Sequence, residues 1–371
     1  MKMVKTSMTA LVSMTLLAGC WDQHNLKDVK LAMATGFDLA PEGNIIQTIT
    51  IPIFTPGAGG MEVQGSQVVV TEGDTPRDAR NIINHKVAEQ LDASKLLVLL
   101  FGEEYAKQDI YTGLDIFYRD PKSSLLANVA IVHGKANEIL SLKPEDRKTT
   151  SEYLNDLITS EQDTTVLPKQ SRPLISDILD PGSDFVLPLI EPQKKEAKII
   201  GLAMFNEHKY TGQFIPVLNA TLYLLMADQL AKRAWIKLKV REGSDVDIRN
   251  FLMINVLKSK RDLAINADNI HDISVDLSLH MKIEIMEYHE NDLVSEKIQA
   301  LTQTISDKLT QQANAILQMT QQANSDCLGI GSYIRAYHHA TWDKTSWEDA
   351  YPDINFKANV TVEISKHGVF N

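Results

Sequence analysis

The stretch "KLLVLLFGEEYAKQDIYTGLDIFYRDP" (residues 95–121) begins with an apolar run, continues into charged and polar residues, and stops at a proline. A short apolar run of this kind is typical of a buried strand, and it is too short to cross a membrane. The remainder predicts one or two short helices that Pro121 ends. Strands that alternate with helices are typical of a mixed α/β sheet. This stretch therefore sets the expected fold class.

Upstream of this unit, the sequence predicts extended structure. Two runs with alternating apolar positions flank a turn at residues 40–44. Pro52 within the second run indicates a sheet edge or a bulge, because proline cannot donate a hydrogen bond to a neighbouring strand. The glycine-rich segment at residues 55–66 is expected to be a flexible loop.

The alternation of strands and helices continues on both sides of residues 95–121. A helix is predicted to begin at residues 74–76, with Asp74 or Thr75 as its cap and Pro76 in its first turn. Another buried strand is expected at residues 125–134. We therefore predict one α/β domain over residues 20–190.

The polar segment "EPQKKEAK" (residues 191–198) is the clearest candidate for a domain boundary. It is charged and contains a proline, which is the composition of a linker. A hairpin at residues 199–214 and a helix at residues 215–234 are expected after it. We assign these elements to a middle domain over residues 196–245.

The last part of the chain predicts an α+β domain over residues 246–371. Residues 271–289 alternate apolar and polar, as in a strand with one buried face. A long amphipathic helix is predicted at residues 292–324, and its uncharged polar face of Gln, Thr and Ser is expected to lie in solvent. This helix could form a coiled coil with a partner, but we favour a helix that covers the sheet of its own domain.

The first 19 residues have the features of a secretion signal. Lys2 and Lys5 precede a short apolar segment that ends in "LAGC", with Cys20 at the position of cleavage. This ending resembles the bacterial lipobox, in which the cysteine becomes the first residue of the mature protein and carries diacylglycerol on its sulfur. Cys20 is therefore predicted to be the lipidation site, with palmitate among the attached acyl groups.

The composition narrows the possible functions. The chain has 371 residues, 44% of them hydrophobic, and a formal net charge of −11, which is ordinary for a globular protein. The negative charge argues against binding to nucleic acid and against electrostatic binding to anionic lipid, so membrane attachment is expected to come from the lipid. Only Cys20 and Cys327 are cysteines, and acylation of the first leaves no pair for a disulfide.

No motif in the sequence assembles a catalytic or metal site. His338 and His339 are adjacent and lack further ligands at a suitable spacing, so no metal is expected. Cys327 is interpreted as a small packing residue, and Ser332 as the cap of a short helix. We therefore predict a protein that is not an enzyme and that binds no cofactor.

Several segments resemble, in order, the Ger(x)C family of spore germination lipoproteins. The N-terminal "GCWDQHNL" is similar to the start of the mature family members, and "GDTPRDARNIIN" is similar to their first domain. The residues that match the family patterns are Gly102, Glu103, Leu114, Asp115, Arg119 and Asp120, then Gly201, Ala203, Phe205, Lys209 and Gly212, and finally Asp326, Leu328, Gly329 and Gly331. The resemblance spans nearly the whole chain, although Cys327 stands where the family often has proline.

This resemblance implies a three-domain α+β lipoprotein, with mixed and antiparallel sheets flanked by helices. It implies a non-catalytic subunit of a nutrient germinant receptor on the outer face of the inner spore membrane. The expected partners are polytopic receptor subunits of the A and B types. The resemblance supplies no ligand site.

Two other functions are weighed against this one. A solute-binding lipoprotein of an uptake system would need two similar lobes built from repeated βα units. A cell-wall hydrolase on a lipid anchor would need paired carboxylates or a zinc site. The second half of the chain reads as antiparallel strands with one long helix, which favours the receptor subunit.

Overall fold

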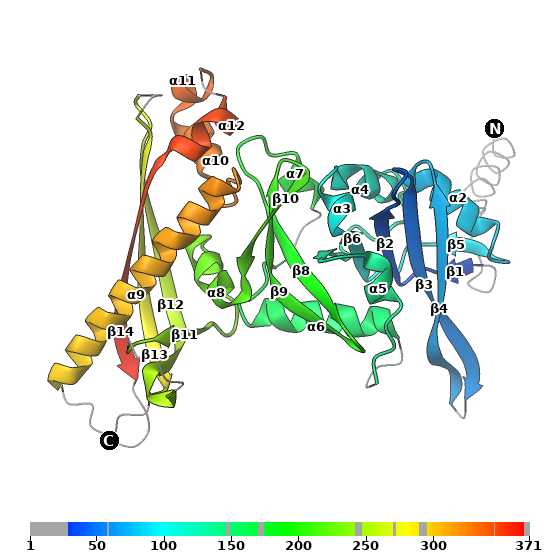
Figure 1. The fold of residues 1–371 in the computed structure, drawn as a ribbon, viewed down its shortest axis with the longest axis horizontal. Helices are drawn as coiled ribbons and strands as arrows, with labels where there is room; N and C mark the ends of the chain where they lie inside the picture. The colour runs from blue at the N-terminus through cyan, green and yellow to red at the C-terminus, as the bar shows by residue number, and fades with distance from the viewer. Residues whose placement is uncertain are drawn as a thin grey trace, which may run out of the picture.

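The computed structural model describes residues 29–366, apart from residues 58, 146–148, 170–173, 242–246, 270–271, 289–294 and 345. The predicted signal segment and Cys20 lie outside the described residues. The molecule is elongated, with a large mixed sheet towards the N-terminal end and a smaller sheet at the other end (Figure 1). The mixed α+β class predicted from the sequence is confirmed.

The larger sheet has eight strands in the order β10-β9-β8-β7-β6-β2-β3-β4. Its four central strands are parallel, and an antiparallel pair extends it on each side. The strands are β2 (Ala34–Leu39), β3 (Ile45–Gly57), β4 (Gly60–Gly73), β6 (Val98–Gly102), β7 (Asn128–Val132), β8 (Val186–Gln193), β9 (Glu196–Asn206) and β10 (Lys209–Pro216). A separate parallel pair joins β1 (Val29–Leu31) to β5 (Gln90–Asp92).

Helices cover both faces of this sheet, which explains the uninterrupted apolar run in β6. Val98 and Leu100 face one core, whereas Leu99 and Phe101 face the other, because successive side chains of a strand point to opposite faces. The helices of this part are α2 (Pro76–Asn84), α3 (Glu103–Ala106), α4 (Ile110–Tyr118), α5 (Ala136–Leu140), α6 (Thr150–Asp163) and α7 (Ile175–Ile178). The strand and helices expected at residues 95–121 are therefore confirmed.

Two segments that we expected to be irregular are parts of hairpins. The loop predicted at residues 55–66 is instead the end of the β3–β4 hairpin, which pairs as far as Gly57 and Gly60. The register shifts between Ile53 and Phe54, so the bulge that Pro52 suggested lies directly after it. Backbone pairing with the opposite strand keeps this glycine-rich segment extended.

The linker predicted at residues 191–198 is also wrong as local structure, because these residues form the end of the β8–β9 hairpin. Lys194, with a φ of 37°, lies at its turn. The strands of the predicted first and middle domains consequently share one sheet. The division into three domains remains a prediction.

The smaller sheet has four strands in the order β11-β12-β13-β14. They are β11 (Trp235–Lys239), β12 (Phe251–Asn266), β13 (Ser274–Glu287) and β14 (Asn355–Lys366). The alternation predicted in β13 is confirmed, since Val275, Leu277 and Leu279 are buried against the core. Short 3-10 helices lie at η2 (Ile248–Asn250) and η3 (Tyr351–Asp353).

The long helix α9 (Ser295–Gln322) packs along β14, as the preferred interpretation predicted. Its polar face is not simply in solvent, however. The Val360 N–H donates to Thr310 Oγ1 at 2.9 Å, and the Ala358 N–H donates to Asn314 Oδ1 at 2.9 Å. These side chains satisfy backbone groups along the free edge of β14, which would otherwise invite another strand.

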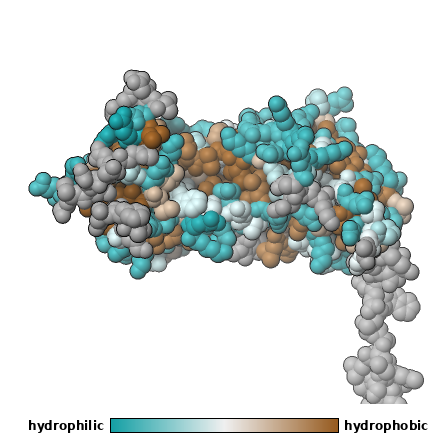
Figure 2. Space-filling model, turned by 90° about the horizontal axis from the view of Figure 1, so that it is seen from below, coloured by the Kyte–Doolittle hydropathy of each residue, from teal (hydrophilic) through white to brown (hydrophobic). Residues whose placement is uncertain are grey.

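Helix α8 (Val217–Met226) lies between the two sheets, and it ends eight residues earlier than we expected (Figure 1). One buried core runs continuously from one face of the larger sheet through α8 to the smaller sheet. The remaining helices, α10 (Ile330–Tyr337), α11 (His339–Trp342) and α12 (Trp347–Ala350), cap one end of the smaller sheet. Seen from below, hydrophobic residues gather over the middle of the long axis (Figure 2).

No helix among the described residues is long and apolar enough to cross a membrane.

Candidate functional site

The two sheets meet at a polar contact centred on a buried carboxylate, Asp326, which is 2% exposed. This aspartate follows α9 and lies just before α10. Its two oxygens accept hydrogen bonds from the backbone N–H groups of Ile330 at 2.9 Å and Gly331 at 2.7 Å. The indole N–H of Trp347 donates to the same carboxylate at 3.0 Å. Asp326 therefore caps α10 and also ties it to α12.

A second carboxylate, Asp184, approaches from the loop before β8. Asp184 Oδ2 accepts the backbone N–H of Asp326 at 2.7 Å, and the Asp184 N–H donates to the Asp326 carbonyl at 3.0 Å. The other carboxylate oxygen accepts the backbone N–H of Glu207, in the β9–β10 turn, at 2.7 Å. We call the contact of residues 180–184, 205–207 and 324–332 the seam.

Glycines let the backbones approach closely at the seam. The Ser332 N–H donates to the Gly182 carbonyl at 2.5 Å. A Cβ at Gly331 would lie 2.5 Å from Trp347 Nε1 and 2.8 Å from the Gly182 carbonyl oxygen. Gly329 adopts a φ of 73°, in the left-handed region that favours glycine. It occupies the N-cap position, so the cap role predicted for Ser332 is wrong. The Ser332 hydroxyl instead lies 3.0 Å from Asp180 Oδ2.

Burial shifts the protonation of both carboxylates. It raises the pKa of Asp326 to about 8 and that of Asp184 to about 6, against the opposing effect of their backbone hydrogen bonds. The Asp184 charge raises the pKa of Asp326 further, and Glu207 and Glu348 do the same for Asp184. At neutral pH the seam therefore holds a proton that two free aspartates would not.

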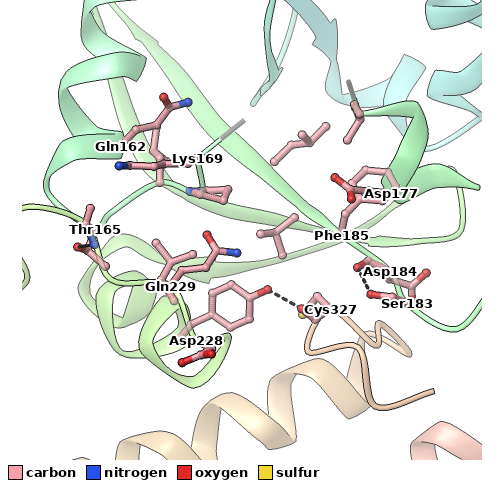
Figure 3. Close-up of a pocket in the computed structure, with 18 of the residues that line it drawn as sticks. Gln162, Thr165, Lys169, Asp177, Ser183, Asp184, Phe185, Asp228, Gln229 and Cys327 are labelled. Atoms are coloured by element: carbon pink, nitrogen blue, oxygen red, sulfur yellow. Dashed lines mark hydrogen bonds between the residues drawn. The ribbon is translucent and has the colours of Figure 1, made fainter. Parts of the chain in front are cut away.

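Two cavities lie on either side of the seam, and both are lined by Ser183 and Asp184. The first has a volume of about 500 Å³ and reaches Cys327 on one side and Gln162, Lys169 and Gln229 on the other (Figure 3). The second has a volume of about 420 Å³ and lies under α11 and α12. We call the second the seam cavity. Each has the size of a small-molecule pocket, which is ~300–1,000 Å³.

A related junction lies inside the larger sheet. Asp38 in β2 is 2% exposed and accepts the backbone N–H groups of Ala136 at 2.7 Å and Asn137 at 2.9 Å. A Cβ at Gly102 would lie 2.1 Å from Asp38 Oδ1, so no other residue fits there without displacement. Asp38 thus caps α5 from a neighbouring strand. Burial raises its pKa.

The residues that match the family pattern have structural roles. Arg80, which is 8% exposed, pairs with Asp120 at 3.1 Å, whereas Arg119 forms a surface pair with Asp115 at 2.7 Å. Gly201 allows β10 to approach, since its Cβ would lie 2.2 Å from the Ile215 carbonyl oxygen.

Cys327, His338 and His339, which the sequence offered as candidate reactive or metal-binding residues, do not form a common site. Cys327 is buried, its carbonyl accepts the Tyr223 hydroxyl at 2.9 Å, and burial raises the pKa of its thiol to about 12. His338 and His339 face different carboxylates, of Asp268 and Asp343. No group of three His, Cys, Asp or Glu residues that could hold a metal occurs among the described residues.

The sequence interpretation missed Asp38 and Asp184. Asp38 carries a signal, because it is a charged residue inside the apolar strand "ATGFDL". Asp184 stands in a proline-rich segment whose partner is 142 residues away, and no local pattern indicates that contact.

Two family models match the chain consecutively. The model for the spore germination protein N-terminal domain matches residues 22–192, and the model described as "Spore germination B3/ GerAC like, C-terminal" matches residues 200–368. Together they cover nearly all of the chain.

Relatives and a solved structure agree with these matches. YfkR of Bacillus subtilis (strain 168) is 23% identical over 95% of this chain and 94% of its own length. The spore germination protein KC of the same organism is 22% identical over 97% and 95%, respectively. The crystal structure of the GerBC protein superposes with a TM-score of 0.57 at 15% identity, and the match covers 93% of this chain and 100% of that one. This likeness supports the multi-domain α+β fold.

Proposed function

The chain belongs to the Ger(x)C family of spore germination proteins, and we propose that it is the lipid-anchored, non-catalytic subunit of a nutrient germinant receptor. It would act with polytopic subunits of the A and B types on the outer face of the inner spore membrane. The observation that carries the proposal is the ordered match of both family models, downstream of a lipobox-like segment ending at Cys20.

Two features of the described residues support a binding role over an enzymatic one. The buried carboxylates, Asp38, Asp184 and Asp326, each accept backbone N–H groups, so they act as structural caps. The one buried thiol, Cys327, has a raised pKa, which is the opposite of what a nucleophile needs.

The structure supports a solute-binding lipoprotein less well than it supports a receptor subunit. That function would require two similar lobes with a βα repeat. The two sheets here have eight and four strands and different orders. Four consecutive strands of the larger sheet are parallel, whereas the described part of the smaller sheet has one parallel pair, β13–β14.

Replacing Cys20 tests the anchoring. We expect Cys20→Ala to move the protein from the membrane fraction of spores to the soluble fraction and to impair nutrient germination. Cys327→Ala is the matched control, because it removes the other cysteine and should leave both properties unchanged. Membrane retention and normal germination in the Cys20→Ala spores would contradict the proposal.

A further inference from the structure

The seam cavity is formed by four segments that are distant in the sequence. They are the loop before β8, the β9–β10 turn, the end of α9 and the helices α11 and α12. Its volume of about 420 Å³ suits a small molecule. The structural roles described above account for Asp184 and Asp326 but not for the open space beside them.

The walls of this cavity are mainly acidic. Among the described residues no lysine or arginine lines them, and His208 is the one lining side chain that can become a cation. Asp180 is balanced by Arg335 at 2.9 Å, and Asp326 is satisfied by three N–H donors. Glu207 and Glu348 are different, because both are exposed and neither forms an ion pair within the described residues. Both charges act on Asp184, so they lie around the same space. The described lining therefore carries more carboxylate charge than His208 could offset.

Aromatic rings complete the lining. Trp342 and Trp347 lie with ring centroids 5.9 Å apart, and their electron-rich faces can attract a cation. Asn324 fixes the wall that carries Glu348, because its amide N–H donates to the Glu348 carbonyl at 3.0 Å.

We propose that the seam cavity binds a small organic cation bearing an ammonium or guanidinium group, held by Glu207 and Glu348 and by the Trp342 and Trp347 rings. The class of ligand follows from the chemistry of the walls. They present carboxylates and aromatic faces, and a ligand with N–H donors and positive charge complements both. A metal ion fits less well, because no described group of three ligands converges.

Binding would also couple to the seam. Asp184 lines the cavity, and the negative charges of Glu207 and Glu348 raise its pKa. A bound cation would oppose those charges and release protons from the seam at pH 6–7. Ligand binding and proton release should therefore occur together.

Titration calorimetry on the full chain tests this proposal independently of germination. The Cys20→Ala chain is titrated with agmatine and with 1-pentylammonium, and 1-pentanol is the neutral control. We expect saturable 1:1 binding of at least one cation and no binding of the alcohol. The Glu207→Gln/Glu348→Gln variant should bind at least tenfold more weakly.

The matched control is Glu62→Gln/Glu296→Gln, which removes two exposed charges outside the lining of the cavity and should bind like the parent. The thermal unfolding midpoint of each variant confirms that it folds. The proposal is overturned if neither cation shows saturable binding at millimolar concentration, or if the Glu207→Gln/Glu348→Gln variant binds as tightly as the parent. Failure of this test leaves the receptor-subunit proposal standing, because anchoring and germination are measured separately.

Discussion

Asp38 and Asp326 solve the same structural problem in two places. Each is a buried carboxylate that accepts two backbone N–H groups at the start of a short helix, and each adjoins a position where only glycine fits. Their electrostatic surroundings differ. Burial raises the pKa of both. The charges of Lys135 and Glu138 act on Asp38 in opposite directions, whereas Asp326 faces a second carboxylate, Asp184, and its pKa rises to about 8. The junction within one sheet is electrostatically balanced, and the seam between the two sheets is not.

The largest loss of unfolding free energy is expected from Asp326→Ala. The substitution leaves the N–H groups of Ile330, Gly331 and Trp347 buried without acceptors, and it releases α10 and α12 together. At about 1–3 kcal/mol for each unsatisfied group, we expect a loss of about 3–5 kcal/mol of unfolding free energy, measured by urea denaturation. A loss below about 1 kcal/mol would show that the seam does not depend on this carboxylate.

Asp38→Ala should lower the unfolding free energy by less than Asp326→Ala does. It removes the acceptor of two backbone N–H groups instead of three donors, and no second helix depends on it. We expect a loss of about 2–3 kcal/mol in the same measurement. A larger loss than that of Asp326→Ala would reverse the comparison between the two junctions.

A glycine substitution at the seam is expected to cause a smaller loss of unfolding free energy. In Gly331→Ala the new Cβ meets the Trp347 ring and the Gly182 backbone, and we expect a loss of about 1–3 kcal/mol. Gly43→Ala is a useful control, because no atom lies within 4 Å of its Cβ position, although its φ of 92° adds local strain. If the two variants lose the same stability, close packing at the seam is not the cause.

The pH dependence of the unfolding free energy reports mainly on the seam, and the raised pKa of Asp38 acts in the same direction. The folded chain holds Asp184 and Asp326 with raised pKa values of about 6 and about 8, so it binds more protons than the unfolded chain above about pH 4. The unfolding free energy should therefore fall as the pH rises from 5 to 8. Surface carboxylates with lowered pKa values, such as Asp247 at about 2, act only below this range.

Denaturation at pH 5, 6, 7 and 8 measures this slope, and the Asp184→Asn variant is the comparison. We expect the variant to show a shallower slope between pH 5 and 7, since it removes one of the two titrating groups. Stability that rises over this interval in the parent chain would contradict the assignment of raised pKa values.

Much of the fold was predictable because the signals are local. The apolar run of β6, the alternation of β13 and the Thr75–Pro76 start of α2 each indicate the element that forms. Segments whose conformation depends on a distant strand were predicted less well. The end of the β3–β4 hairpin is the clearest example, because backbone pairing overrides its glycine content.

The seam was not predictable for the same reason. Asp184 and Asp326 are 142 residues apart, and neither stands in a pattern that indicates a carboxylate partner. The polar face of α9 was misjudged similarly, since Thr310 and Asn314 bond to the edge of β14. The resemblance to a family supplied Asp326 and Gly331 as motif residues, and the structure supplied their physical reason.

The most direct test of the proposed function is isolation of the tagged chain from detergent-solubilised spore membranes, followed by identification of the proteins that remain bound. A germinant receptor subunit should retain its acyl group on Cys20 and should co-purify with two polytopic subunits, of the A and B types. A chain without an acyl group, or one that co-purifies with the permease and ATPase of an uptake system, would contradict the account.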